Sequence, residues 1–118
     1  MMGMLIRVDP ASSVPIFEQL AASIRREALD GTAAAGDRLP PARELAESLG
    51  INVHTVLHAY QQLRDEGLVE LRRGRGAVLT GQVATLAGLE SHVHALVAEA
   101  RRLGVPAQTL TTLILEAY

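Results

Sequence analysis

The sequence contains no cysteine, and all eleven of its cationic side chains are arginine because lysine is also absent. Without cysteine the chain can form no disulfide, no thiolate metal site and no cysteine nucleophile. Without lysine it can form neither a Schiff base nor a phosphate-binding loop of the GKS or GKT type. These two absences exclude redox sensing, pyridoxal-phosphate chemistry and P-loop nucleotide hydrolysis.

Aromatic residues are scarce, since the chain has one Phe, two Tyr and no Trp. Proteins that stack single-stranded bases need several exposed rings, so that mode of nucleic-acid binding is not expected. No apolar run reaches the ~18 residues that span a bilayer, and the first residues lack the pattern of a signal peptide. We therefore expect no membrane contact and a cytoplasmic protein.

The remaining composition is that of a folded protein, with 48% hydrophobic and 20% charged residues in 118 positions. This length suits one small domain with an appendage and an aliphatic core. The net charge of -2 is unusual for a DNA-binding protein, which is commonly basic. The distribution of charge is more informative than the sum, because several arginines fall between residues 38 and 75: Arg38, Arg43, Arg72, Arg73 and Arg75.

The first predicted helix follows the Ser12–Ser13 pair, which we expect to cap it, with Pro15 near its first turn. Apolar residues recur at helical spacing from Ile16 onward, and Gly31 ends the helix. Residues 4–8 before it are predicted to form a short strand or arm that ends at Asp9-Pro10.

A second, short helix is predicted from Pro41 to Gly50, and a third begins at the cap residue Asn52 and runs toward Gly67. Only Gly50 and Ile51 join the two helices. A turn this short, with a glycine that can adopt positive φ, sets consecutive helices at a steep angle. The pattern is typical of a helix-turn-helix.

Two short strands, residues 68–71 and 77–80, are predicted to flank the glycine-containing sequence RRGRG. They form a hairpin with arginines at its tip. The fold expected is thus mainly α with a small β-hairpin wing, a winged helix-turn-helix over residues 1–80. A helical tail over residues 81–118 completes the chain.

These segments resemble the DNA-binding domain of the GntR family of bacterial regulators. The resemblance covers PIFEQLAASIRREALDG, GDRLPPARELAESLG and INVHTVLHAYQQLRDEGLVELRRGRGAVL, which include the LPPARELA box and the RRGRG wing. The short tail is similar to that of the YtrA subfamily, in which it serves dimerisation. The resemblance implies a transcription regulator, and related short-tailed regulators often control transporter operons.

The third helix is the expected recognition element, because the N-terminal residues of a helix in the major groove meet base edges. Those residues are Asn52, Val53, His54, Thr55 and His58. Asn can pair with adenine through two hydrogen bonds, Thr can bond a base edge, and both Thr and Val can contact a thymine methyl group.

The resemblance implies further contacts outside this helix. Arg43 corresponds to a family position near the DNA backbone, and Arg72, Arg73, Gly74 and Arg75 match the wing that enters the minor groove. Arginine suits both places because its planar donors fit phosphate and it is favoured in narrow minor grooves. Family members often carry arginine where this chain has Val53 and Leu57, so its operator is expected to differ.

Three other functions are less consistent with the sequence: a protein-interaction module, a metal-binding protein and an enzyme. A winged helix can serve as a protein-interaction module, but clustered arginines at a hairpin tip repel one another unless they meet an anion. His54 and His58 share a helix face, yet two ligands do not make a metal site, and we expect neither metal nor cofactor. The chain shows no phosphate loop, nucleophile elbow or paired carboxylates, so we do not expect an enzyme.

The tail carries more apolar surface than two short helices can bury alone, which predicts a symmetric homodimer. The residues expected at this interface are Leu89, Val93, Leu96, Val97, Leu110, Leu113 and Ile114. A small-molecule effector, whose identity the sequence does not give, would have to use the dimer interface. The function predicted is therefore a homodimeric repressor that binds double-stranded DNA at a palindromic operator.

Overall fold

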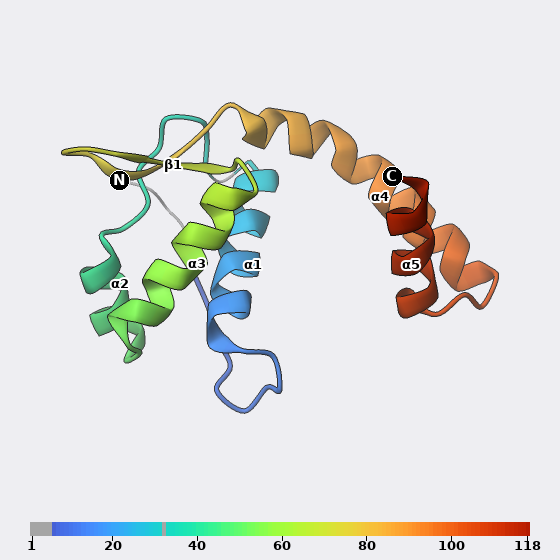
Figure 1. Cartoon of the computed structure of the whole chain (residues 1–118), viewed down its shortest axis with the longest axis horizontal. Helices are drawn as coiled ribbons and strands as arrows, with labels where there is room; N and C mark the ends of the chain where they lie inside the picture. The colour runs from blue at the N-terminus through green and yellow to red at the C-terminus, as the bar shows by residue number, and fades with distance from the viewer. Residues whose placement is uncertain (1–5, 32) are drawn as a thin grey trace. The chain divides into compact units, whose positions relative to one another are not determined.

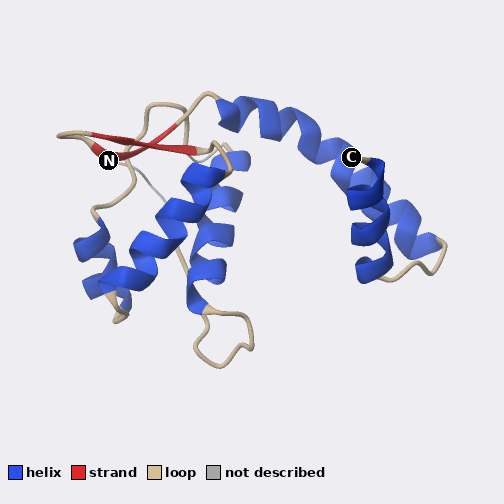
Figure 2. Cartoon of the chain, in the orientation of Figure 1, coloured by secondary structure: helices blue, strands red, loops and turns tan. Residues whose placement is uncertain are grey.

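A computed structural model describes residues 6–31 and 33–118 of the chain. In these residues the elements follow the order α1 (Ile16–Leu29), α2 (Ala42–Leu49), α3 (Val53–Asp65), β1 (Val69–Arg72), β2 (Gly76–Leu79), α4 (Gln82–Arg102) and α5 (Ala107–Ala117). Figures 1 and 2 show α1, α2 and α3 with the β1–β2 hairpin in the first part of the chain, and α4 and α5 in the last. The mainly α fold with one β-hairpin is confirmed.

The chain divides into two compact units, one ending at Ala87 and the other running Gly88–Tyr118. We predicted a boundary after Thr80. The start of α4 belongs to the first unit because Val83 is 7% exposed and Leu86 packs against the same buried cluster. Among the described residues, no helix is long and apolar enough to cross a membrane.

The start of α1 differs from the prediction. Its cap residue is Pro15, which makes no side-chain cap hydrogen bond, so the expected cap by Ser12 and Ser13 is wrong. The Ser12 hydroxyl instead accepts a hydrogen bond from the Val14 N–H at 3.1 Å, within the turn that precedes the helix. The predicted end is confirmed, because Gly31 has a φ of 84° directly after the cap residue Asp30.

The segment before α1 is an arm held by Gln19 and by Ser23, whose hydroxyl accepts from the Arg7 N–H at 3.3 Å. Residues 6–8 form no strand, while residues 4 and 5 of the predicted strand or arm lie outside the described residues. The Gln19 carboxamide accepts from the Asp9 N–H at 2.6 Å and donates to the carbonyls of Asp9 (3.1 Å) and Val14 (2.7 Å). This clamp brings Ile6 and Val8 against the core.

The turn between α2 and α3 matches the sequence expectation. Gly50 ends α2 in the left-handed region with a φ of 69°, which a residue bearing a Cβ adopts only at a cost. Asn52 caps α3, since its side-chain oxygen accepts from the His54 N–H at 2.7 Å. The two helices therefore form the predicted helix-turn-helix.

The hairpin is antiparallel and tighter than predicted. Arg72 pairs with Gly76 and Val69 with Leu79, so each strand is shifted by one residue from its expected limits. The loop shortens to residues 73–75 because Gly74 and Gly76 take positive φ values of 80° and 75°. Residues 36–39 lie along β2, with an isolated bridge between Arg38 and Val78.

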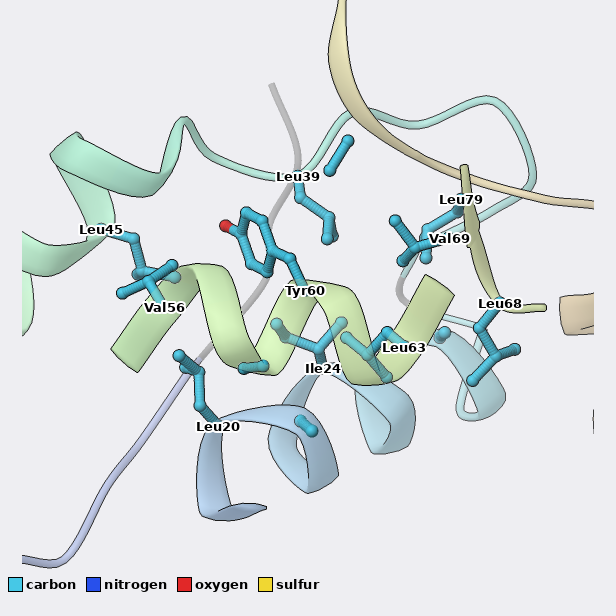
Figure 3. Close-up of a cluster of buried hydrophobic side chains, with 14 of the residues drawn as sticks. Leu20, Ile24, Leu39, Leu45, Val56, Tyr60, Leu63, Leu68, Val69 and Leu79 are labelled. Atoms are coloured by element: carbon cyan, nitrogen blue, oxygen red, sulfur yellow. The ribbon is translucent and has the colours of Figure 1, made fainter. Parts of the chain in front are cut away.

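The core of the first unit is aliphatic, as the composition predicts, apart from one phenol. Leu20 and Ile24 of α1 meet Val56 and Leu63 of α3, and Tyr60 points toward the loop before α2 (Figure 3). Residues from the hairpin and its flanks close the cluster from the other side: Leu39, Leu68, Val69 and Leu79. This packing fixes α3 against α1 and the base of the wing.

The second unit buries little of its apolar surface. No residue of α5 is buried, and among the apolar residues of the unit only Ala100 falls below a tenth exposure. A turn at Gly104, with a φ of 74°, joins α4 to α5, and the Val105 N–H donates to the Ala100 carbonyl at 2.8 Å. The unit thus consists of two helices whose leucines and valines remain largely in solvent.

Candidate nucleic-acid interface

All five residues predicted to read bases lie at the N-cap or in the first two turns of α3. Asn52, His54 and His58 are exposed, whereas Val53 and Thr55 are half-buried. Val53 packs against the core, which leaves less of its side chain for a thymine methyl group. The polar surface available at the start of this helix is therefore formed chiefly by the exposed Asn52 amide and the two imidazoles.

Asn52 has a structural contact in addition to its predicted contact with DNA. Its side-chain oxygen already accepts the His54 N–H at 2.7 Å as the cap of α3. A two-bond pair with adenine would require the same oxygen to accept a second hydrogen, which its second lone pair permits. The cap also fixes the orientation of the amide before any contact with DNA.

His58 lies against α1. Its imidazole stacks on the Phe17 ring with centroids 3.8 Å apart and an interplanar angle of 14°. One face of the imidazole is thus covered, and the ring can meet a base through its edge or its uncovered face. Sequence periodicity assigned Phe17 to the core face of its helix and did not indicate this contact.

Arg43 is exposed in the first turn of α2, where the resemblance placed a backbone contact. Within the described part of the chain its guanidinium has no hydrogen-bond or ion-pair partner. No group of three or more His, Cys, Asp or Glu that could hold a metal occurs among the described residues. His54 and His58 therefore lack a third protein ligand in this part of the chain.

The wing presents three arginines in different environments. Arg72 pairs with Glu70 across 3.3 Å, at an exposed position where such pairs contribute little stability. Arg73 and Arg75 are exposed, and in the residues described their guanidinium groups have no polar partner. Gly74 separates them and has a φ of 80°. The tip is thus a small cationic surface in which one charge is partly offset.

Two hydrogen bonds hold α3, the loop before α2 and the wing in place, and sequence analysis predicted neither of them. The Tyr60 hydroxyl donates to the Pro40 carbonyl at 2.6 Å, which ties α3 to the loop before α2, and burial raises the pKa of this phenol. The Arg38 Nε donates to the Arg75 carbonyl at 2.9 Å, which ties the same loop to the wing. Both contacts join residues far apart in the sequence.

Comparison with known proteins agrees with this geometry. The family model described as "Bacterial regulatory proteins, gntR family" matches residues 16–79. The chain is 41% identical over 81 residues to the transcriptional repressor YtrA of Bacillus subtilis, which covers 69% of this chain and 62% of that protein. The aligned region thus spans less than two thirds of that relative.

Two further relatives match over more of their length. The transcriptional regulator Rv1152 of Mycobacterium tuberculosis is 35% identical over 104 residues, covering 85% of this chain and 83% of that protein. The solved structure of YtrA from Sulfolobus acidocaldarius, a GntR-family transcription factor, has a TM-score of 0.64 at 33% identity and covers 82% of this chain and 97% of that one.

The winged helix-turn-helix over the matched segment and the relatives named as transcription regulators lead to one conclusion. The chain belongs to the GntR family of bacterial regulatory proteins, and it is a DNA-binding transcription regulator rather than an enzyme.

Proposed function

We propose that this regulator is a repressor that binds a palindromic operator as a homodimer. The observation that carries the proposal is the placement of exposed polar residues at the start of α3 together with unpaired arginines on α2 and the wing. In this arrangement α3 enters the major groove, and the wing reaches the adjacent minor groove. The cap of α3 by Asn52 supports a fixed presentation of the reading residues.

The small net charge restricts how this surface can bind DNA. Non-specific affinity depends on the number of phosphates that cationic side chains neutralise. With a net charge of -2, the chain as a whole is not attracted to a polyanion, so binding relies on Arg43, Arg72, Arg73 and Arg75. We therefore expect weak binding to random DNA and a shallow salt dependence for each subunit.

The second unit is the proposed dimer interface. Three of its predicted contact residues on α4, Leu89, Val93 and Leu96, are 51%, 48% and 44% exposed, and Leu113 and Ile114 on α5 are 52% and 41% exposed. Val97 and Leu110 are half-buried. A symmetric contact with a second copy would remove this apolar surface from water and give two reading heads for two half-sites.

Repression follows from occupancy, because a dimer bound over a promoter excludes polymerase. The Bacillus subtilis relative is named as a transcriptional repressor, which supports this sign of regulation. The family resemblance extends the proposal to control of a transporter operon. Since its partner is chromosomal DNA, we place the protein in the cytoplasm.

Selection of bound sequences from a random DNA pool tests the proposal. We expect an inverted repeat with half-sites about one helical turn, ~34 Å, apart, as required by two heads related by a two-fold axis. Light scattering should give the mass of a dimer. A selected site without two-fold symmetry would contradict the homodimer model. So would a monomeric variant of the chain that binds the selected site as tightly as the unmodified protein.

A mobility shift at two salt concentrations separates this proposal from a protein-interaction module. We expect the protein to retard the selected DNA at low salt and to dissociate as salt rises. Binding of the protein displaces counterions from the phosphates, and their release becomes less favourable at high salt. No retardation even at low salt would refute DNA binding and favour the interaction module.

A further inference from the structure

The loop before α2 is built into the wing as a third, partial strand. Its backbone pairs with β2 through three hydrogen bonds: Gly36 N–H to the Leu79 carbonyl at 2.8 Å, Leu39 N–H to the Ala77 carbonyl at 2.8 Å, and Leu79 N–H to the Asp37 carbonyl at 2.9 Å. Arg38 lies between these contacts, opposite Val78. The backbone of Arg38 is therefore fixed with respect to the wing.

The side chain of Arg38 extends this connection to the hairpin turn. Its Nε donates to the Arg75 carbonyl at 2.9 Å. Gly74 and Gly76 flank that carbonyl with positive φ values, and glycine loses more conformational freedom on ordering than other residues. An isolated two-stranded hairpin is marginally stable in water, so a side chain that holds its turn has a clear role.

A pocket of about 210 Å³ lies between α3, the loop before α2 and the wing, and both residues of the Arg38–Arg75 contact line it. Leu57 and Tyr60 line it from α3, Leu71 from β1, and Pro40 from the loop, and Arg38 and Arg75 also line it. Leu57 and Leu71 are 41% and 48% exposed, so apolar surface is accessible from solvent. The lining of the pocket thus combines apolar residues with two arginines.

We propose that Arg38 is a positioning residue that sets the orientation of the wing, and that this pocket receives a sugar–phosphate unit of the operator. The inference rests on the proposed function. If α3 occupies the major groove and the wing the minor groove, the strand that separates the two grooves must cross the surface between them. An apolar lining suits the deoxyribose carbons, and guanidinium groups suit the phosphate.

The positioning role is tested on the free protein, without DNA. Substitution Arg38→Met keeps the length of the side chain and removes its donors. By ¹⁵N relaxation we expect the order parameters of Gly74 and Gly76 to fall from ~0.85 to below ~0.6 in this variant. Arg73→Met is the matched control, since it removes a wing cation without touching the contact, and it should leave both values unchanged. Unchanged order in Arg38→Met would overturn the positioning role.

The pocket is tested by replacing single operator phosphates with neutral methylphosphonates. At the phosphate that lies between the grooves, wild-type protein should lose about tenfold in affinity, as expected for one charge-assisted contact. Arg38→Met should lose clearly less from the same replacement, because the guanidinium of Arg38 no longer contributes to that contact. Equal losses in both proteins at every position would overturn the pocket assignment.

A chemical footprint provides a readout that misfolding would not reproduce. Arg38→Met should keep the protection of guanine N7 atoms in the major groove and lose the protection of sugars in the minor groove beside the wing. Loss of both protections together would contradict a role confined to the wing. If wild-type protein bound no operator, the proposed function would fail, while the relaxation measurement would still decide the role of Arg38.

Discussion

Tyr60 offers the sharpest test of how the reading helix is held in place. The phenol is 4% exposed, and its hydroxyl donates to the Pro40 carbonyl at 2.6 Å. Tyr60→Phe removes this hydrogen bond without creating a cavity around the ring. Leaving the carbonyl without its partner costs ~1–3 kcal/mol of unfolding free energy, which lowers the melting temperature by ~4–8 °C per kcal/mol in a domain of this size.

The same side chain predicts how stability depends on alkaline pH. Burial raises the pKa of Tyr60 in the folded protein above the ordinary value of a phenol. The contribution of the Tyr60 phenol to the free energy of unfolding is therefore fully present below the unfolded pKa of ~10. It is lost as the pH rises above that value, because the unfolded chain then releases the phenol proton and the folded chain does not. At pH 11, above the unfolded pKa, the loss is on the order of 1 kcal/mol.

The absence of lysine simplifies this measurement, since no lysine side chain titrates near the pKa of a phenol. Urea unfolding at pH 8 and pH 11 should show the stability gap between wild type and Tyr60→Phe shrinking by an amount on the order of 1 kcal/mol. Tyr118→Phe is the control, because that side chain is fully exposed and the substitution removes a phenol without removing a buried group. A gap that stays constant from pH 8 to pH 11 would refute the burial of the Tyr60 phenol.

Three further predictions concern DNA binding and assembly. Arg73→Ala should weaken binding to all sequences and reduce the salt slope by about one unit per head, measured by anisotropy, and an unchanged slope would remove Arg73 from the interface. Thr55→Ala should cost ~1–3 kcal/mol on the operator and little on random DNA, so equal losses on both would contradict base reading. Deletion of residues 88–118 should give a monomer by light scattering with affinity reduced ~10²–10⁴-fold, and a persisting dimer would refute the interface. The deletion spares Val83, which belongs to the core of the first unit.

Much of the fold was predictable because local signals determine it. Gly31 and Gly50 mark helix ends where the backbone adopts positive φ, and the Asn52 cap depends on a residue two positions away. The Ser12–Ser13 cap was predicted from the same kind of signal and is wrong. There the arm folds back onto α1 through Gln19, a tertiary contact that displaces the local one.

The parts that were not predictable depend on residues distant in the sequence. Arg38 was grouped with the arginines of the segment that the motif predicts to face DNA, whereas its Nε contacts a carbonyl 37 positions away. The stack of Phe17 on His58 and the bond from Tyr60 to Pro40 likewise require the packed core. Periodicity identifies which side chains face inward, but it does not identify the partner that each one meets.

The central claim is that this chain reads DNA sequence through α3 and the wing. The most direct test compares the affinity of the full chain for its selected operator and for the same duplex with scrambled half-sites, at a physiological salt concentration. We predict at least ~10³-fold tighter binding to the operator, as is usual for specific regulators. Equal affinity for the two duplexes would contradict the account.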